Sequence, residues 1–284
     1  MGARWRYRLG DEVHDLTYRT LVMGILNRTP DSFYDAGLTY EFDALLRRAE
    51  VLVTEGADLL DVGGVKAGPG PEVGEEEELD RVVGPIAALH QRFDTPISCD
   101  TWRAGVLDAA CEVGAVVGND ISGFGDPDYV GVAAKHGASV VATHIRLKPR
   151  VPDPEPHYDD LVGDVTAFLL DRAAQAHAAG LEPDQIALDA GLDLGKTPAQ
   201  SMVLLRDSDV LAERGYTLLL SASNKRYLGD LLGLAIDERR AVSLASVAYG
   251  VAHGCRIVRV HDVKGSVQVC RMVEAILEHE SVAS

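Results

Sequence analysis

The sequence contains no apolar run approaching the roughly 20 residues that a membrane-spanning helix needs. Its basic N-terminus is not followed by a long apolar segment, so it lacks the form of a secretory signal. Cysteine is scarce: Cys99, Cys111, Cys255 and Cys270 show no Cys-X-X-Cys spacing and lie within apolar stretches. Such cysteines are typical of buried thiols in a reducing compartment, and we therefore expect a cytoplasmic protein.

Positive charge is also in short supply. The 284 residues include 27 lysines and arginines against 44 acidic residues, which gives a formal charge of −17. A field of that sign repels nucleic-acid backbones and anionic lipids, so we expect neither as a partner. A local basic cluster could still bind a small anion. Hydrophobic residues make up 46% of the chain, enough for a large core, and the length suits one domain spanning residues 1–284.

Short apolar segments alternate with segments of helical periodicity along the chain. Several of the helical segments end on a glycine just before the next apolar segment, as helix C-termini commonly do. Eight apolar segments have the pattern of strands buried on both faces: 21–26, 59–62, 97–99, 116–117, 139–142, 186–188, 217–220 and 257–260. Helices are expected at 42–54, 79–91, 104–112, 161–179, 238–252 and 267–277.

Eight strand–helix units without a long linker predict a single (β/α)8 TIM barrel, an α/β fold. The main alternative is an open doubly wound sheet, which usually has a glycine-rich phosphate turn after its first strand. Here residues 27–31 (NRTPD) follow the first strand instead. The longest irregular segment, 146–157, carries four prolines, and we expect it to form an extended loop over the active face.

Polar residues collect where the predicted strands end. In a TIM barrel these ends form one face, at which groups from several strands meet. Any one such residue could instead cap a helix or satisfy a buried hydrogen bond. A complete series is better explained by a polar site for a small ligand rich in donors and acceptors. The residues are Asn27, Asp61, Asp100, Asn119, Asp120, His144, Asp189, Lys225, Arg259 and His261.

Many of these positions lie in motifs that resemble those of dihydropteroate synthases. The motifs are 23–33 (MGILNRTPDSF), 61–64 (DVGG), 98–103 (SCDTWR), 119–123 (NDISG), 188–191 (LDAG), 195–197 (GKT), 223–225 (SNK) and 259–263 (RVHDV). They follow the family's order and cover nearly the whole chain, and the first and last are highly specific. The resemblance implies a TIM barrel, usually paired as a homodimer, and agrees with the strand count.

The family joins 6-hydroxymethyl-7,8-dihydropterin diphosphate to 4-aminobenzoate and releases diphosphate. The resemblance implies that the pterin is bound by Asp100, Asn119, Asp189 and Lys225. A carboxylate such as Asp189 can accept two N–H bonds from the aminopyrimidine edge, which a purely apolar pocket could not discriminate.

The resemblance also indicates which residues would bind the diphosphate and the metal ion and which would form a lid over the site. Arg259 and His261 would bind the diphosphate, and Asn27 would help to hold Mg²⁺ as the cofactor. Residues 29–38 resemble the mobile loop that closes over the site and excludes water. That loop contains Ser32 and Asp35, and the predicted catalytic residues are Asp35 and Lys225.

The loop expected to bind the second substrate departs from the family pattern. After Asp-X-Gly-Gly the family usually continues Glu-Ser-Thr-Arg-Pro-Gly, whereas residues 65–70 read VKAGPG. Ala67 therefore replaces a threonine and Gly68 an arginine, and Lys66 is a new charge. In the later motifs, Asn224 after Ser223 replaces an arginine, and Leu194 replaces a phenylalanine.

Neutral drift in mobile loops could explain these changes. However, all four fall on the aminobenzoate side, while the pterin and diphosphate sides are intact. The chain thus resembles the second dihydropteroate-synthase-like copy of some actinobacteria, in which VKAGPG also occurs. Three hypotheses follow: a transferase that uses 4-aminobenzoate or another aryl amine, a non-catalytic pterin-binding paralogue, and a pterin methyltransferase of the methyltetrahydrofolate barrel type. The last is weakest, because a methyl donor has no diphosphate for Arg259 and His261 to bind.

Overall fold

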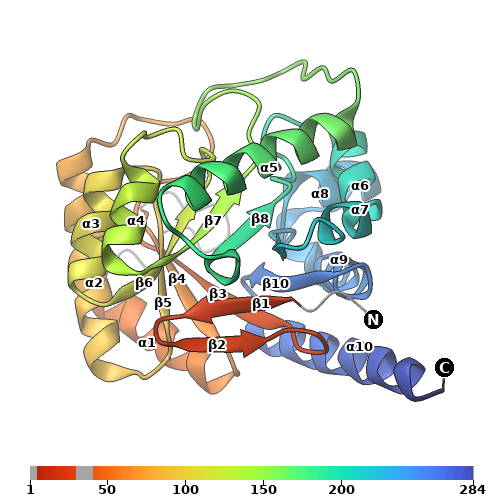
Figure 1. Cartoon of the computed structure of the whole chain (residues 1–284), viewed down its shortest axis with the longest axis horizontal. Coiled ribbons are helices and arrows are strands. Elements are labelled where there is room, and N and C mark those ends of the chain that lie inside the picture. The colour runs from red at the N-terminus through yellow and green to blue at the C-terminus, as the bar shows by residue number, and fades with distance from the viewer. Residues whose placement is uncertain (1–4, 30–40, 284) are drawn as a thin grey trace.

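The computed structural model describes residues 5–29 and 41–283, in which eight parallel strands close into a barrel (Figure 1). Neighbouring strands follow the order β10-β3-β4-β5-β6-β7-β8-β9. Their bounds are β3 Leu21–Asn27, β4 Leu59–Gly63, β5 Ile97–Asp100, β6 Ala115–Asp120, β7 Ser139–Thr143, β8 Ile186–Asp189, β9 Thr217–Leu220 and β10 Cys255–Val260. All eight predicted strands are confirmed, and the closed sheet excludes the open doubly wound alternative.

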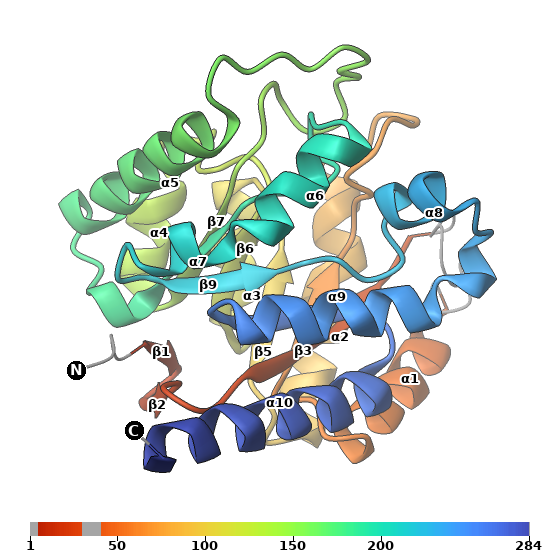
Figure 2. The same ribbon diagram turned by 90° about the vertical axis from the view of Figure 1, so that its right-hand side faces the viewer.

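Helices surround the barrel on its outer side, as Figures 1 and 2 show. They are α1 Phe42–Thr54, α2 Glu75–Arg92, α3 Ala104–Glu112, α4 Tyr129–His136, α5 Leu161–Ala178, α6 Pro198–Arg206, α7 Ser208–Ala212, α8 Arg226–Leu232, α9 Arg240–Ala252 and α10 Val263–Ala283, with 3₁₀ turns η1 Pro183–Gln185 and η2 Ile236–Glu238. The six helices predicted with bounds are present; of the others, only the end of α4 was predicted, from the glycine that follows His136, and α6, α7 and α8 were not predicted. Gly137 ends α4 with a φ of 65°, the left-handed conformation expected of a glycine C-cap. Within the described ranges, no helix is both long and apolar enough to cross a bilayer.

An N-terminal β-hairpin that the sequence did not predict closes one end of the barrel. Strand β1 (Arg6–Leu9) pairs antiparallel with β2 (Glu12–Asp15). Tyr7 and Leu9 are buried and pack in one cluster with side chains from the starts of the barrel strands, such as Met23. The hairpin backbone also accepts hydrogen bonds from the first residues of β7 and β9. The hairpin therefore seals the N-terminal end, and the opposite end is left for a site.

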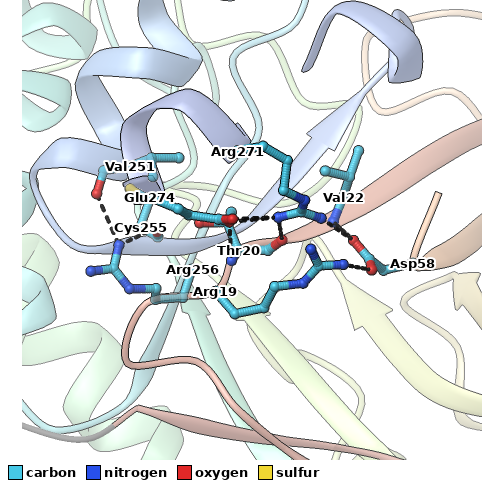
Figure 3. Close-up of polar contacts among 9 residues, drawn as sticks. All are labelled: Arg19, Thr20, Val22, Asp58, Val251, Cys255, Arg256, Arg271 and Glu274. Carbon is cyan, nitrogen blue, oxygen red and sulfur yellow. Dashed lines mark hydrogen bonds and ion pairs between the residues drawn. The ribbon is translucent and has the colours of Figure 1, made fainter. Parts of the chain in front are cut away.

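A polar cluster at the same N-terminal end ties the last helix to the barrel (Figure 3). Glu274 of α10 accepts a hydrogen bond from the backbone N–H of Thr20 at 2.6 Å and from Arg271 at 2.6 Å. Asp58, just before β4, accepts from Arg19 and from the backbone N–H of Val22. These contacts join α10, β3 and β4 far from the strand ends that carry the predicted site.

Alternation along the strands sorts inward from outward side chains. Residues two apart in a strand point to the same face. The buried cluster around Tyr7 takes every second residue of the strands, including Leu59, Val117, Ala187 and Ile257. Two residues further along each strand, the inward series becomes polar, at Asp61, Asn119, Asp189 and Arg259. The sequence thus places apolar side chains at one end of the barrel interior and polar side chains at the other.

Candidate functional site

A hollow of about 500 Å³ lies at the C-terminal ends of the strands. The residues assigned to ligands, metal or catalysis by the family resemblance line it wherever they fall in the described ranges, whereas the polar strand ends Asp61, Asp120 and His144 do not. Asp35 and Ser32, the predicted lid residues, lie outside the described residues. The predicted residues in the wall are Asn27, Lys66, Ala67, Gly68, Asp100, Asn119, Asp189, Ser223, Asn224, Lys225, Arg259 and His261.

Arg259 lines this hollow and donates hydrogen bonds to two acids from neighbouring strands. Its Nε donates to Asp61 Oδ2 at 2.5 Å, and its Nη2 donates to Asp100 Oδ2 at 2.6 Å. Asn119 Nδ2 donates to the same oxygen of Asp61 at 3.1 Å. Residues from four strands, β4, β5, β6 and β10, are thereby joined into one buried hydrogen-bonded group.

Burial and charge act against each other in this group. Burial raises the pKa of Asp100 to about 7, and Arg259 only partly opposes that rise. Burial alone would lower the pKa of Arg259, but Asp61 and Asp100 together raise it. Arg259 therefore stays charged, while the pKa of Asp100 lies close to neutral pH. Such a group can change its charge when a ligand displaces water or brings its own charge.

Asp189 and Lys225 are two further charged residues in the wall. Asp189 Oδ1 accepts the backbone N–H of Gly191 at 2.8 Å, and its Oδ2 makes no hydrogen bond within the described residues. Burial raises the pKa of Asp189, although Lys225 opposes the change. Burial lowers the pKa of Lys225, whose Nζ donates to the carbonyl of Leu192 at 2.5 Å. An acceptor and a donor therefore line the same hollow, as a ligand with both kinds of group requires.

His261 is held as a neutral imidazole beside Ser223. Its Nδ1 lies 3.0 Å from Ser223 Oγ, and its backbone N–H donates to the same oxygen at 3.2 Å. Burial, with the charges of Arg259 and Arg48, lowers the pKa of His261 to about 3. A neutral histidine can donate a hydrogen bond to an anion without adding positive charge to the hollow.

The sequence comparisons agree with this geometry. The pterin-binding enzyme family matches residues 23–261 of the chain. The chain belongs to that family. It is 38% identical over 266 residues to the dihydropteroate synthase of Bacillus subtilis, covering 93% of this chain and 91% of that protein. It is 41% identical over 268 residues to the inactive dihydropteroate synthase 2 of Mycobacterium leprae, covering 91% of each.

A structural relative gives the same result. The Yersinia pestis dihydropteroate synthase, solved with a sulfonamide drug, superposes with a TM-score of 0.92 at 37% sequence identity. The alignment covers 96% of this chain and 99% of that one. The resemblance predicted from the motifs is confirmed, including its link to a second-copy paralogue.

Asn224, one departure from the family pattern, has a structural role in this chain. Its φ of 56° is left-handed, a conformation that asparagine tolerates better than most residues. Its backbone N–H donates to Ser243 Oγ at 3.0 Å, and its Oδ1 accepts from that hydroxyl at 3.3 Å. Asn224 thus anchors the turn before α8 to α9 as well as lining the hollow.

Several residues in or directly behind the wall were not predicted as part of the site. Asp61 was predicted as a polar strand end but given no role; it lies behind the wall, fully buried, and is one of the two carboxylate partners of Arg259. Asp193, Arg226 and Arg239 line the hollow but belong to loops and to the start of α8. Only Asp61 carried a usable signal, because it has the same inward alternation as Asn119 and Asp189.

Two polar strand ends, Asp120 and His144, face the helices instead of the hollow. Asp120 accepts the backbone N–H groups of Ser122 at 2.6 Å and Phe124 at 2.8 Å. His144 Nδ1 lies 2.9 Å from Lys196 Nζ. Burial lowers the pKa of His144 to about 3 and that of Lys196 to about 7. These groups brace the loops around the site.

Replacing His144 with Asn should flatten the acid sensitivity of the fold. Because the pKa of His144 is lowered from 6.5 to about 3 in the folded chain, the unfolded chain binds more protons between those values. The contribution of His144 to the unfolding free energy is therefore fully present above pH 6.5 and is lost as the pH drops toward 3. Asn keeps an acceptor for Lys196 but does not titrate. The unfolding free energy of the variant should therefore fall by about 1 kcal/mol less per pH unit in that window than that of the original chain. Urea unfolding at several pH values measures this, and parallel curves would refute the assignment.

Proposed function

We propose that this chain binds 6-hydroxymethyl-7,8-dihydropterin diphosphate in the hollow and transfers its pterin-methyl group to an aryl amine. The observation that carries the proposal is the gathering of Asp100, Asn119, Asp189 and Lys225 in one wall around Arg259. These side chains offer buried acceptors and donors from separate strands, which suits the amide and amidine edge of a pterin.

In the proposed reaction, the amine nitrogen forms a bond to the pterin methylene carbon as the carbon–oxygen bond to diphosphate breaks. The diphosphate leaves with the bonding electron pair, and the amine gives up one proton to solvent. Arg259 and His261 would stabilise the leaving group through charge-assisted and neutral hydrogen bonds. The ion pairs of Arg259 with Asp61 and Asp100 hold its guanidinium in place before the ligand arrives.

Mg²⁺ fits this hollow only as a partner of the diphosphate. The described residues contain no group of three or more His, Cys, Asp or Glu side chains placed to hold a metal ion. Mg²⁺ commonly uses one or two protein oxygens together with substrate phosphates and water. The amide oxygen of Asn27 supplies a suitable ligand at the end of β3. When bound, the metal would neutralise charge developing on the leaving diphosphate.

We expect dihydropteroate formation from 4-aminobenzoate at a rate at least tenfold below that of the Bacillus subtilis relative. A small ligand makes few contacts, so the loss of about 1.4 kcal/mol already costs a factor of ten. Ala67, Gly68 and Leu194 line the hollow, and the family resemblance assigns them to the second-substrate side. The assay combines purified protein, Mg²⁺, pterin diphosphate and 4-aminobenzoate, and measures diphosphate and dihydropteroate separately.

The outcomes separate the hypotheses. A rate comparable with the relative's would refute the weakened second site. Tight pterin binding without diphosphate release for any amine would favour the second candidate, a non-catalytic paralogue. The similarity to a Mycobacterium leprae protein named as inactive supports that candidate. By the same resemblance we propose a homodimer, which light scattering would test.

A further inference from the structure

A second hollow, of about 550 Å³, adjoins the first. Its wall combines the loop after β4, the segment after β7 and the turn before α6. Figure 2 shows the green segment after β7 arching beyond the strand ends. The two hollows share five lining residues, Ala67, Gly68, Asp193, Leu194 and Arg226. They are therefore adjacent parts of one larger cavity.

The departures from the family pattern lie at this junction. Three of the five shared residues, Ala67, Gly68 and Leu194, are smaller than the threonine, arginine and phenylalanine that the family usually carries there. Gly68 does not have a left-handed φ, and a Cβ built on it would meet only Lys66 Cε at 3.7 Å. The backbone therefore does not require glycine at this position. The effect of Gly68 is to leave space between the two hollows.

The far wall is fixed in place by hydrogen bonds. Arg150 donates from its backbone N–H to the carbonyl of Ala67 at 3.2 Å and from Nη1 to the carbonyl of Lys66 at 3.1 Å. Arg146 pairs with Asp153 within the same segment. Tyr158 Oη also donates to the carbonyl of Gly195 at 2.7 Å. The segment 146–157 was predicted only as a loop over the active face. Its hydrogen bonds and ion pair hold it in place as a wall, so the second hollow exists before any ligand binds.

The lining predicts what would fill the second hollow. Leu147 and Val151 are 42% and 50% exposed, and three prolines of the same segment lie beside them. This surface suits an apolar chain. Lys148 forms no ion pair or side-chain hydrogen bond within the described residues, and Arg150 bonds carbonyls, not carboxylates. In a chain of net charge −17, two cations without carboxylate partners favour an anionic end on the ligand.

We propose that the second hollow binds the distal part of an aryl-amine substrate longer than 4-aminobenzoate. That part is an apolar chain ending in a carboxylate. The inference rests on the proposed function and leaves its chemistry unchanged, because the amine nitrogen still replaces diphosphate on the pterin methylene carbon and releases one proton. The long substrate regains, in the second hollow, contacts that the altered loop no longer offers to a small one.

The test compares 4-aminobenzoate with N-(4-aminobenzoyl)-6-aminohexanoate. Affinity for each amine is measured by calorimetry on the full chain saturated with Mg²⁺ and pterin diphosphate, so the result does not depend on turnover. We expect the long amine to bind at least tenfold more tightly. Equal affinities, with pterin diphosphate bound, would overturn the inference and leave the proposed function standing. Failure to bind pterin diphosphate would overturn the proposed function itself, and the inference with it.

Two variants locate the effect. Val151→Asp places a negative charge in the second hollow and should reduce the long-to-short affinity ratio about tenfold. Val51→Asp is the matched control, because Val51 is 43% exposed on α1 and lines neither hollow. Gly68→Arg should narrow the junction and also lower the ratio. An unchanged ratio in both Val151→Asp and Gly68→Arg would place the long amine elsewhere.

Discussion

Replacing Arg259 with Met should cost roughly 3–5 kcal/mol of unfolding free energy. Arg259 is the shared partner of two acids, Asp61, which is fully buried, and Asp100. Met fills much of the same volume but leaves both carboxylates without their cation. Chemical unfolding at pH 8 measures the loss. A cost below 1 kcal/mol would mean that the ion pairs contribute little and that Arg259 serves the ligand alone.

The pH dependence of this loss has a definite sign. The pKa of Asp100 is already raised to about 7, and removing Arg259 takes away the charge that opposes the rise. A raised carboxyl pKa favours the folded chain at low pH, and this contribution is lost as the pH rises from about 4 through the folded pKa. The penalty of Arg259→Met should therefore be smaller at pH 5 than at pH 8.

Two controls separate burial from charge. The double variant Arg259→Met with Asp61→Asn should recover part of the loss, because one buried carboxylate is neutralised. Arg226→Met breaks the pair with Asp230 at a side chain that is 83% exposed, and should cost less than about 1 kcal/mol of unfolding free energy.

Arg259→Met should also weaken the binding of pterin diphosphate more than the binding of the free pterin alcohol. Equal weakening would argue that the residue organises the wall without binding phosphate.

The barrel strands were predictable because each is a short apolar run buried on both faces. The hairpin β1–β2 was not, because its buried face offers only Tyr7 and Leu9 between charged residues. Those two side chains are covered by the barrel interior, which is assembled from distant strands. Helix α8 was missed because it is seven residues long, too short to show helical periodicity.

The site was predictable to the level of strand ends but not of partners. Motif resemblance brought together residues that line one hollow, yet nothing local links Arg259 to Asp61, 198 positions earlier in the chain. Alternation along the strands would have separated Asp120 and His144 from the inward series. The left-handed turn at Asn224 shows a different limit: its loss of an arginine side chain looked like decay, but the residue also anchors α9 through Ser243.

Asp189→Asn should strongly weaken pterin binding without unfolding the protein. Asn can still accept the backbone N–H of Gly191 through Oδ1, so the local turn is retained. Its amide nitrogen then replaces the Oδ2 acceptor in the hollow and opposes the donors of the ligand. Unpaired buried donors cost about 1–3 kcal/mol each, so the expected loss is roughly 2–4 kcal/mol, a factor of about 30 to 1,000 in affinity. Calorimetry with a dihydropterin measures it.

The matched control is Asp120→Asn, at a strand end that faces the helices. Both carboxylate oxygens of Asp120 accept backbone N–H groups, from Ser122 and Phe124, so an amide there must oppose one of them. That variant should lose about 1–3 kcal/mol of unfolding free energy and keep its affinity for pterin. The two substitutions change the same atoms on opposite faces of the sheet. If Asp189→Asn instead lowered stability and left pterin affinity intact, the hollow would not be the pterin site.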